Sequence, residues 1–194
     1  MDVRQSYAAT SRRELTKAQN REAILAAARL VFAELGFAAA TVRDIIRATP
    51  LASGTFYNYF KSKEEVYQAL RDELALAVRP RLREARLSAT SAEEFFAGTF
   101  HALFLFLTET ETAPERFRMD SPQVLAGFAE LRQDIEAAMA RGLLPATDAA
   151  LLSAALIGVA FELAEQVKAG AGAEDMARFA TALFLGGINA LPKS

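Results

Sequence analysis

The 194-residue chain is expected to be all-α, with a small three-helix domain followed by a larger helical bundle. Three observations predict this fold class. Apolar residues recur every three to four positions along most of the chain, which is the spacing of amphipathic helices, and no segment alternates with the period of a strand. Ser, Thr or Asp precedes these segments at cap positions, and Gly or Pro follows them. Basic residues gather in the first third of the chain, whereas the rest is acidic.

The composition excludes several classes of protein. Apolar residues make up 52% of the chain, so it can bury a core and is not disordered. Without cysteine it has neither a disulfide framework nor a thiolate metal site. The longest apolar run, residues 149–161, falls short of the roughly 20 residues of a membrane span. Residues 1–15 lack the apolar core of a signal peptide. We therefore expect a soluble, cytoplasmic protein with no membrane partner.

Charge divides the sequence unevenly. Residues 1–63 contain ten Lys or Arg and five Asp or Glu, a net charge of +5, so the other residues carry −7. A basic module on an acidic body is typical of a phosphate-binding domain attached to a regulatory one. Chance clustering of the charges is the alternative.

Residues 1–15 show no apolar periodicity and are expected to form a mobile arm. Its arginines, Arg4, Arg12 and Arg13, are candidates to reach a phosphate or a DNA minor groove. An ordinary solvated tail is the interpretation we favour for them.

The first expected helix begins at Thr16, because Thr16 and Gln19 have the spacing of a capping box. A single apolar stripe follows at helical spacing, made of Ile24, Leu25, Ala28, Val31, Phe32 and Leu35. Gly36 is the residue type that commonly ends a helix. This helix carries no chemistry of its own, and we interpret it as the support of the next two.

A short capped helix is predicted next. Thr41 is a good N-cap, and Asp44 lies at the capping-box position three residues later. One apolar face follows at helical spacing, made of Val42, Ile45 and Ile46. Pro50 cannot continue the helix, because it lacks an N–H and clashes with the preceding turn.

A second short helix is predicted to start near Ser53. Phe56 and Phe60 lie four residues apart and therefore point into a core. The residues left facing outward are Ser53, Gly54, Thr55, Tyr57, Asn58 and Tyr59. Lys61 and Lys63 follow. Such an aromatic, polar and basic surface is costly to display without a partner, and a helix-turn-helix with its second helix in a DNA major groove supplies one.

Residues from about Lys17 to Leu74 resemble the DNA-binding domain of the tetracycline-repressor (TetR) family of bacterial transcriptional regulators. The resemblance rests on REAILAAARLVFAELGF, on TVRDI and on SGTFYNYFKSKEEV, of which SGTFYNYF is the most specific part. The rest of the chain matches the family only in length and helicity. Pro50 stands where the family usually has glycine. Ala52 replaces the usual serine at the N-cap of the recognition helix, a role that Ser53 can take.

The resemblance implies roles for individual residues. Contacts with the DNA backbone or with thymine methyl groups are expected from Thr41, Tyr57, Tyr59, Lys61 and Lys63. Base edges are expected within reach of Arg43, Ser53, Gly54 and Thr55, and Asn58 completes the predicted DNA-binding face. Because one short helix makes too few base contacts for a specific site, we expect a homodimer on a double-stranded palindromic operator.

Residues 63–194 are expected to form a ligand-binding and dimerisation domain behind a DNA-binding domain of residues 16–62. Ser62 and Glu65 have the spacing of a capping box, and they open a helix that Pro80 should end or kink. The arginines near its end are Arg79, Arg81, Arg83 and Arg86. We interpret them as a solvated face.

Four further helices are predicted in this domain. Their expected starts are Ser91, Ser121, Thr147 and Glu174. The helices of about residues 148–169 and 174–191 have wide apolar surfaces and small residues that allow close approach. A monomer would leave a large apolar patch exposed, so we expect them to pair with a second copy, as is usual in the family. Burial within one chain is the alternative.

The sequence gives less evidence for an effector-binding site than for a DNA-binding face. The phenylalanine-rich helices of residues 95–106 and 122–139 suggest an apolar cavity for an unknown small molecule. The candidate ligand-binding residues are His101, Phe104, Phe128, Phe161 and Glu162, and Glu162 is expected to be buried. Ordinary core packing by the same aromatic side chains is the interpretation we favour.

The chain offers few groups for catalysis, since it has one histidine, no cysteine and no HExxH, Walker, GxGxxG or GxSxG motif. We expect no enzyme activity, no cofactor and no metal site. The predicted function is a ligand-responsive transcriptional regulator, with repression as the expected mode and release by a small, largely apolar ligand. Two alternatives stay open: a nucleoid-type protein that binds DNA without sequence preference, and a helical ligand-binding protein that has lost DNA binding.

Overall fold

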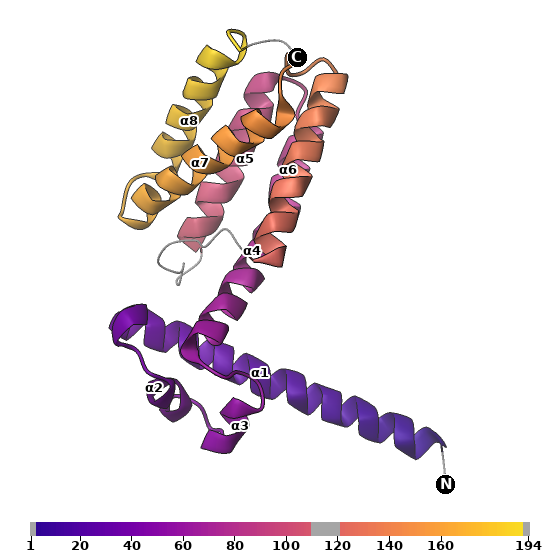
Figure 1. The fold of residues 1–194 in the computed structure, drawn as a ribbon, viewed down its shortest axis with the longest axis vertical. Helices are drawn as coiled ribbons and strands as arrows, with labels where there is room; N and C mark the ends of the chain where they lie inside the picture. The colour runs from indigo at the N-terminus through magenta and orange to yellow at the C-terminus, as the bar shows by residue number, and fades with distance from the viewer. Residues whose placement is uncertain (1–2, 110–120, 192–194) are drawn as a thin grey trace. The chain divides into compact units, whose positions relative to one another are not determined.

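The computed structural model describes residues 3–109 and 121–191, with side chains from residue 12 onward (Figure 1). The helices are α1 (Val3–Ala39), α2 (Val42–Arg47), α3 (Ser53–Tyr57), α4 (Lys63–Ser88), α5 (Ala92–Glu109), α6 (Pro122–Ala140), α7 (Ala149–Lys168) and α8 (Ala173–Ile188). The described residues contain no strand, so the all-α prediction is confirmed. The chain divides into an N-terminal unit, residues 1–71, and a C-terminal unit, residues 72–194.

Helix α1 is longer than the sequence predicted. It begins at Val3, and Thr16 donates its hydroxyl to the Arg12 carbonyl at 2.9 Å, as a residue inside a helix does. The expected start at Thr16 is therefore wrong, and residues 3–15 of the expected arm are helical. The reason is that Ala, Arg, Glu, Lys and Gln have high helix propensity and form helix without an apolar stripe. Residues 1–2 lie outside the described residues, and the mobility of the arm stays a prediction. Arg4 lies before the residues whose side chains are described.

Gly36 interrupts α1, as its position in the sequence predicted. Its φ of 74° and ψ of 155° lie outside the helical region, and glycine adopts such a conformation at little steric cost. The kink is followed by Ala40, which is buried, and by α2, which packs against α1.

One core holds the N-terminal unit together. Its fully buried residues include Ile24, Leu25, Ala28, Ile45, Phe56 and Val66. Ala69 and Leu70 of α4 pack against the same core, so the first two turns of α4 belong to this unit. The division therefore falls after Arg71 rather than after Ser62, where the sequence placed it.

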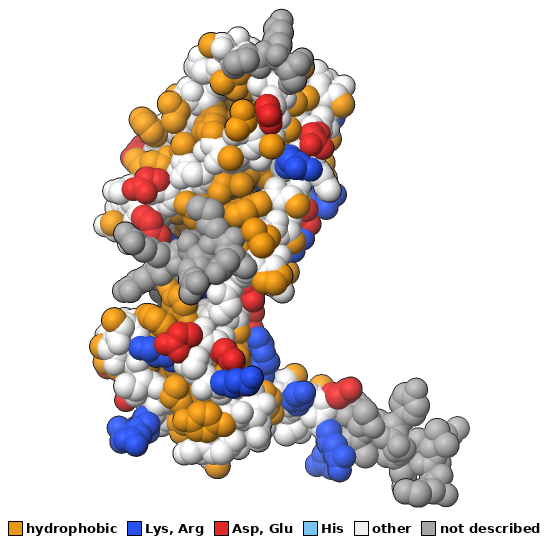
Figure 2. All heavy atoms as spheres, viewed as in Figure 1, with side chains coloured by type: hydrophobic (Ala, Val, Ile, Leu, Met, Phe, Trp, Pro, Cys, Tyr) orange, Lys and Arg blue, Asp and Glu red, His pale blue; other side chains and the backbone are white. Residues whose placement is uncertain are grey.

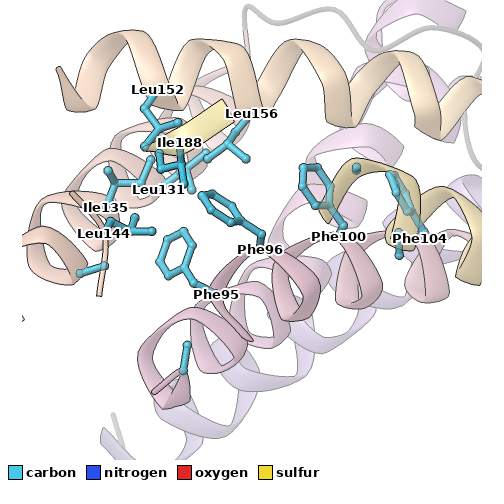
Figure 3. Packing of buried hydrophobic residues seen from close by; sticks show 14 of the residues in the cluster. Phe95, Phe96, Phe100, Phe104, Leu131, Ile135, Leu144, Leu152, Leu156 and Ile188 are labelled. Carbon is cyan, nitrogen blue, oxygen red and sulfur yellow. The ribbon is translucent and has the colours of Figure 1, made fainter. Parts of the chain in front are cut away.

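The C-terminal unit is a bundle built from the rest of α4 and from α5 to α8. Helix α5 packs most extensively against α8 and also contacts α7, which packs against α6. Phenylalanines of α5 fill the centre: Phe95, Phe96, Phe100 and Phe104 are at most 1% exposed (Figure 3). Phe184 of α8 stacks on two of these rings, with centroid distances of 5.5 Å to Phe96 and 5.7 Å to Phe100. The expectation that α5 is buried on several sides is confirmed.

Caps and glycines fix the ends of the later helices where the sequence placed them. Ser121 Oγ accepts from the Val124 N–H at 3.1 Å at the start of α6. Asp148 Oδ1 accepts from two N–H groups, at 2.8 and 3.0 Å, at the start of α7. Gly142, with φ of 75°, and Gly170, with φ of 103°, supply the left-handed residues that follow α6 and α7.

Helix α4 does not end at Pro80 but continues to Ser88. The interpretation of its arginines as a solvated face is wrong for two of them. Arg86 is buried and Arg79 is half-buried, because α6 offers each a carboxylate, Asp134 and Glu130. A periodic run of arginines on one helix does not reveal the acceptors on another.

Among the described helices, α7 is long and apolar enough to cross a membrane by length and composition alone, with a mean hydropathy of 1.6. Only 28% of its most apolar window is buried within the chain. One helix of this kind carries little weight for a membrane span, because a core helix of a soluble protein meets the same criterion.

Candidate nucleic-acid interface and internal cavity

A complete capping box opens α2. The Thr41 hydroxyl donates to Asp44 Oδ2 at 2.6 Å and accepts from the Asp44 N–H at 3.3 Å, while the Thr41 N–H donates to the same carboxylate at 3.0 Å. These hydrogen bonds hold the pKa of Asp44 below its usual value, and the Thr41 hydroxyl contributes most. The predicted cap is confirmed, and the exposed Thr41 side chain is engaged in it.

A threonine that the sequence did not single out closes the turn between α2 and α3. The Thr49 hydroxyl donates to the Ile46 carbonyl at 2.8 Å and accepts from the Leu51 N–H at 3.2 Å. Pro50 lies exposed between them and needs no hydrogen bond, because it has no N–H. Leu51 packs against the core of the unit and fixes the far side of the turn. Pro50 is thus compatible with a well-formed turn.

Two phenylalanines anchor α3. Phe56 is 1% exposed and Phe60 is 6% exposed, and the Phe60 N–H still donates to the Phe56 carbonyl at 3.1 Å beyond the end of the helix. Tyr57 is 59% exposed, as predicted. Tyr59 is half-buried and packs against the core, so the expectation that both tyrosines stand free of the core is wrong for Tyr59.

The rest of the α3 face is open. Ser53, Gly54 and Asn58 are exposed, whereas Thr55 is half-buried. Ala52 occupies the N-cap position and makes no side-chain cap bond, and Ser53 is the first helical residue rather than the cap that the sequence suggested. The N-terminal turn of α3 therefore has no side-chain cap.

Gly54 is a costly choice for an exposed helical position. A Cβ placed on it would meet nothing within 4 Å, so the packing of the unit does not require glycine there. Glycine inside a helix costs roughly 0.5–1 kcal/mol relative to alanine. Glycine leaves the surface of α3 unobstructed at this position.

Lys63 does not have the role that the resemblance implies. Its Nζ donates to the carbonyls of Phe37 at 2.7 Å, Ala38 at 3.2 Å and Ala40 at 2.8 Å, and it lies 4.6 Å from the Phe37 ring centroid. An ammonium has three donors, so all three are used within the chain. The prediction of a phosphate contact from Lys63 is therefore corrected: Lys63 caps the C-terminal carbonyls of α1.

The remaining basic side chains flank α3. Arg43 and Lys61 are exposed, as the DNA-binding prediction requires. A shallow recess joins the N-terminal part of α1 to the end of α3, and its lining residues are Arg12, Arg13, Thr16, Lys17, Asn58 and Tyr59. The cations Arg12, Arg13 and Lys17 thus lie beside Asn58 and Tyr59 of the predicted DNA-binding face. They belong to the N-terminal part of α1, most of which was predicted from the sequence to be a mobile arm.

The C-terminal unit contains a partly open cavity of about 140 Å³ between α4, α5, α6 and α7. Its described walls are largely apolar and include the rings of Phe100, Phe106, Phe128 and Phe161. The rings of Phe128 and Phe161 meet edge to face, with centroids 5.9 Å apart. The body of the protein is therefore not a completely filled core.

Most polar groups of this cavity already have partners. Arg79 binds Glu130, and this pair raises the pKa of Arg79 and lowers that of Glu130. Arg86 Nε donates to Asp134 Oδ2 at 2.8 Å, and Thr99 donates its hydroxyl to a carbonyl of its own helix. The exception is Gln123, whose Oε1 is buried and makes no hydrogen bond.

The structure separates the five predicted ligand-binding residues. Phe128 and Phe161 line the cavity, whereas Phe104 is fully buried in the central cluster and is not among the lining residues. His101 is exposed, in a surface recess between α5 and α8. Glu162 is exposed on α7, so the expectation that it is buried is wrong. His101 and Glu162 are thus both exposed. Burying either polar side chain in the apolar interior without a hydrogen-bond or ion-pair partner would be costly in free energy.

Residues 24–70, which hold the C-terminal part of α1, all of α2 and α3 and the start of α4, match the family described as bacterial regulatory proteins, tetR family. Over these residues the chain is similar to the TetR family. That family consists of regulatory proteins and not of enzymes, which agrees with the expectation of no enzyme activity.

Individual proteins are similar over longer stretches. The chain is 40% identical over 88 residues to the HTH-type transcriptional repressor KstR2 of Mycolicibacterium smegmatis, a match that covers 45% of this chain and 42% of that protein. The fatty acid degradation regulator FadR from Bacillus halodurans has a TM-score of 0.71 at 23% identity, covering 87% of this chain and 95% of that one. FadR from Bacillus subtilis, solved with stearoyl-CoA, has a TM-score of 0.70 at 21% identity, covering 86% and 98%. At these identities the two structures show a shared fold.

Sequence reasoning missed three features of this chain. Lys17 carried a signal, since it belongs to the basic first third, but its place beside α3 depends on how far α1 extends. For Thr49 the indication was weaker, namely a hydroxyl residue next to a proline in a predicted turn. For Gln123 the sequence contained no indication, because nothing in it shows that Oε1 of this side chain is buried without a hydrogen bond.

Proposed function

We propose that this chain is a TetR-family, ligand-responsive transcriptional regulator of the bacterial cytoplasm that binds a palindromic operator as a homodimer. A small, largely apolar ligand in the cavity of the C-terminal unit releases it from DNA. Repression is the expected mode, and KstR2, its relative over 88 residues, is named a repressor.

The open face of α3 carries the DNA-binding part of the proposal. Phe56 and Phe60 fix the inner side of the segment in the core, so Ser53, Gly54 and Tyr57 are presented to solvent on a short, rigid element. Gly54 admits close approach, and exposed cations stand on neighbouring elements. This arrangement suits a recognition helix in a major groove with phosphate contacts at its sides.

The apolar surface of α7 and α8 supports a homodimer. Leu151 of α7 is 70% exposed, and Phe179 and Leu183 of α8 are 58% and 52% exposed. In Figure 2 hydrophobic side chains spread over much of the visible face of the C-terminal unit. A second copy that covers these helices removes this surface from water and supplies the second α3 that a palindrome needs.

Helix α4 offers a route for coupling. Its first turns contribute Val66 to the core of the N-terminal unit, and its later turns contribute Leu74, Val78, Arg79 and Arg86 to the cavity wall. A ligand that favours the DNA-incompetent arrangement by about 1–3 kcal/mol changes operator affinity about 5- to 150-fold.

Selection of bound fragments from the genomic DNA around the gene of this protein tests the proposal. Recovery of a palindrome supports the regulator. Random fragments with a steep salt dependence and no preferred site indicate a nucleoid-type protein instead. No recovered DNA indicates a ligand-binding protein that has lost DNA binding. Operator affinity is then measured with and without candidate ligands, and equal affinities at saturating ligand reject the ligand response.

A further inference from the structure

One face of α7 is not covered by the rest of the chain. Its exposed residues recur at intervals of four, three and four positions, at Leu151, Ala155, Gly158 and Glu162, so they form a single seam along the helix. A Cβ placed on Gly158 would meet nothing within 4 Å, which shows that the middle of the seam is open. The first three of these residues are small or apolar, and Glu162 brings a charge into the same seam.

Glu162 makes no hydrogen bond and no ion pair with any other residue in the described part of the chain. In the proposed homodimer a second copy covers α7, and the carboxylate of Glu162 then loses water. A buried carboxylate without a partner is costly in free energy. A cation that the second copy brings to Glu162 would offset this cost.

Arg178 of α8 is the cation that the same surface offers. Its side chain is 73% exposed and pairs with Asp175, which is 65% exposed and lies three residues earlier. An exposed pair of this kind contributes little free energy, so it does not hold the guanidinium against a better partner. The other cation of α7 and α8 is Lys168, which is 16% exposed and already bound to an acid of its own helix.

Glu162 and Arg178 lie at the same level of the bundle. Glu162 comes six residues before the end of α7 at Lys168, and Arg178 comes five residues after the start of α8 at Ala173. At 1.5 Å per residue, each is roughly 8–9 Å along its helix from the turn between α7 and α8. The dyad of a palindrome is perpendicular to the duplex, so a dimer that reads it holds equivalent residues of both copies at equal distance from the DNA. Glu162 of one copy and Arg178 of the other then belong to the same layer.

We infer that Glu162 of each copy forms an ion pair with Arg178 of the partner subunit, and that these two symmetric pairs select the partner in assembly. The inference rests on the homodimer of the proposed function and names its charged contact. The apolar side chains of α7 and α8 supply buried surface that many apolar faces could match. Charges of opposite sign at fixed positions reject a wrong partner, so Glu162 acts in assembly rather than in ligand binding.

Charge reversal tests the pair. In a homodimer of Glu162→Arg both contacts join two cations, and in a homodimer of Arg178→Glu both join two carboxylates. Each variant should dimerise about 10-fold more weakly than the wild type when the full-length proteins are compared by analytical ultracentrifugation. The double variant Glu162→Arg with Arg178→Glu restores both pairs with the signs exchanged, and it should dimerise as the wild type does.

The two single variants should prefer each other. In a mixed dimer every contact joins opposite charges, whereas an ion pair within one chain would stay broken in every dimer. A tagged Glu162→Arg chain is co-expressed with an untagged Arg178→Glu chain, and native mass spectrometry counts the dimers. Random pairing gives about half mixed dimers, and a penalty of about 10-fold on each homodimer raises this share to about nine-tenths.

Glu136→Arg and Arg132→Glu are the matched controls, because these residues pair with each other on α6, outside the proposed dimer face, and are 53% and 56% exposed. They change the net charge in the same way and should leave dimerisation unchanged, with about half mixed dimers. Circular dichroism checks that every variant is folded. If a reversal does not fold, Glu162→Gln and Arg178→Gln replace it in a double-mutant cycle, in which coupled losses of dimer affinity support the pair and additive losses overturn it.

Unchanged dimerisation of the single variants overturns the inference, as does random pairing in the mixture, a double variant as weak as the single ones, or equal enrichment of mixed dimers in the controls. Each of these results leaves the homodimer of the proposed function in place. A wild-type chain that sediments as a monomer at every concentration removes that homodimer, and the ion pair with it.

Discussion

Arg86 of α4 and Asp134 of α6 form a buried ion pair, with Arg86 Nε donating to Asp134 Oδ2 at 2.8 Å and both side chains at most 6% exposed. Burial lowers the pKa of Arg86, and the carboxylate opposes this effect. A second pair, Arg79 with Glu130, joins the same two helices. Three of these four residues line the cavity, so the two ion pairs tie α4 to α6 at the cavity wall.

Removing one partner of the buried pair should destabilise the C-terminal unit strongly. The substitution Asp134→Ala leaves the Arg86 guanidinium buried without a counter-charge, for which we expect a loss of about 3–5 kcal/mol in the free energy of unfolding. Chemical denaturation of the full chain measures it. Glu136→Ala is the matched control, because Glu136 lies on the same helix but is 53% exposed. We expect it to change stability by less than about 1 kcal/mol.

Replacing both partners should behave differently. The double variant Arg86→Met with Asp134→Leu removes both charges together, and such replacements are often neutral or stabilising. We expect it to recover most of the stability lost in Asp134→Ala. If the double variant is as unstable as Asp134→Ala, the single loss does not come from an unpaired charge.

Substitutions of the two lysines beside α3 should have different effects, one on the stability of the chain and the other on its affinity for DNA. Lys63→Met removes three hydrogen bonds to the end of α1 and should cost about 1–3 kcal/mol of stability. Lys61→Met should leave the melting temperature unchanged, because Lys61 is exposed, and should weaken operator binding. Thermal melting and operator titration of both variants check this. A stable Lys63→Met protein with weakened DNA binding would restore the phosphate role that the family resemblance implies.

The same lysine shows where prediction from sequence stops. Thr41 and Phe56 were placed correctly because capping boxes and helical spacing are local patterns, set by residues a few positions apart. Lys63 was misassigned because its acceptors lie 23 to 26 residues earlier in the chain. Arg86 was taken for a solvated residue because its acceptor is 48 residues away. Gln123 lies among cavity residues from four helices and has a buried, unbonded Oε1, which no local pattern records.

Acid should weaken the start of α2 through Asp44. Its pKa is lowered chiefly by the hydrogen bond from the Thr41 side chain, which means that the folded chain stabilises the carboxylate. This stabilisation is complete above the pKa of Asp44 in the unfolded chain and is lost as pH falls through the lower pKa in the folded chain. Wild type should therefore unfold at higher urea concentration than Asp44→Ala at pH 7, and the difference should shrink below about pH 4. A difference that is constant with pH would show that the carboxylate is not responsible.

The outer and inner faces of α3 should respond differently to truncation. Phe60→Ala empties a core position that is 6% exposed and should cost about 3–5 kcal/mol. Tyr57→Ala removes a ring that is 59% exposed and should leave the melting temperature nearly unchanged while lowering operator affinity. Circular dichroism melts and operator titrations compare the two. Equal losses of stability would mean that Tyr57 is a packing residue.

The N-terminal turns of α1 should contribute phosphate contacts. Arg12, Arg13 and Lys17 line a recess together with Asn58 and Tyr59, so DNA held on α3 would bring phosphates close to these cations. Each alanine substitution should weaken binding to all sequences about equally. It should also reduce the slope of log affinity against log salt by about 0.9 per lost contact, or about 1.8 for a dimer.

Arg132→Ala is the charge control for this series, because Arg132 is 56% exposed and pairs with Glu136 on α6 in the C-terminal unit. Its slope should equal that of the wild type. A change of operator preference rather than of slope would mean that the α1 side chains read base edges. An unchanged slope in all three α1 variants would show that these cations are solvated, as the sequence alone favoured for Arg12 and Arg13.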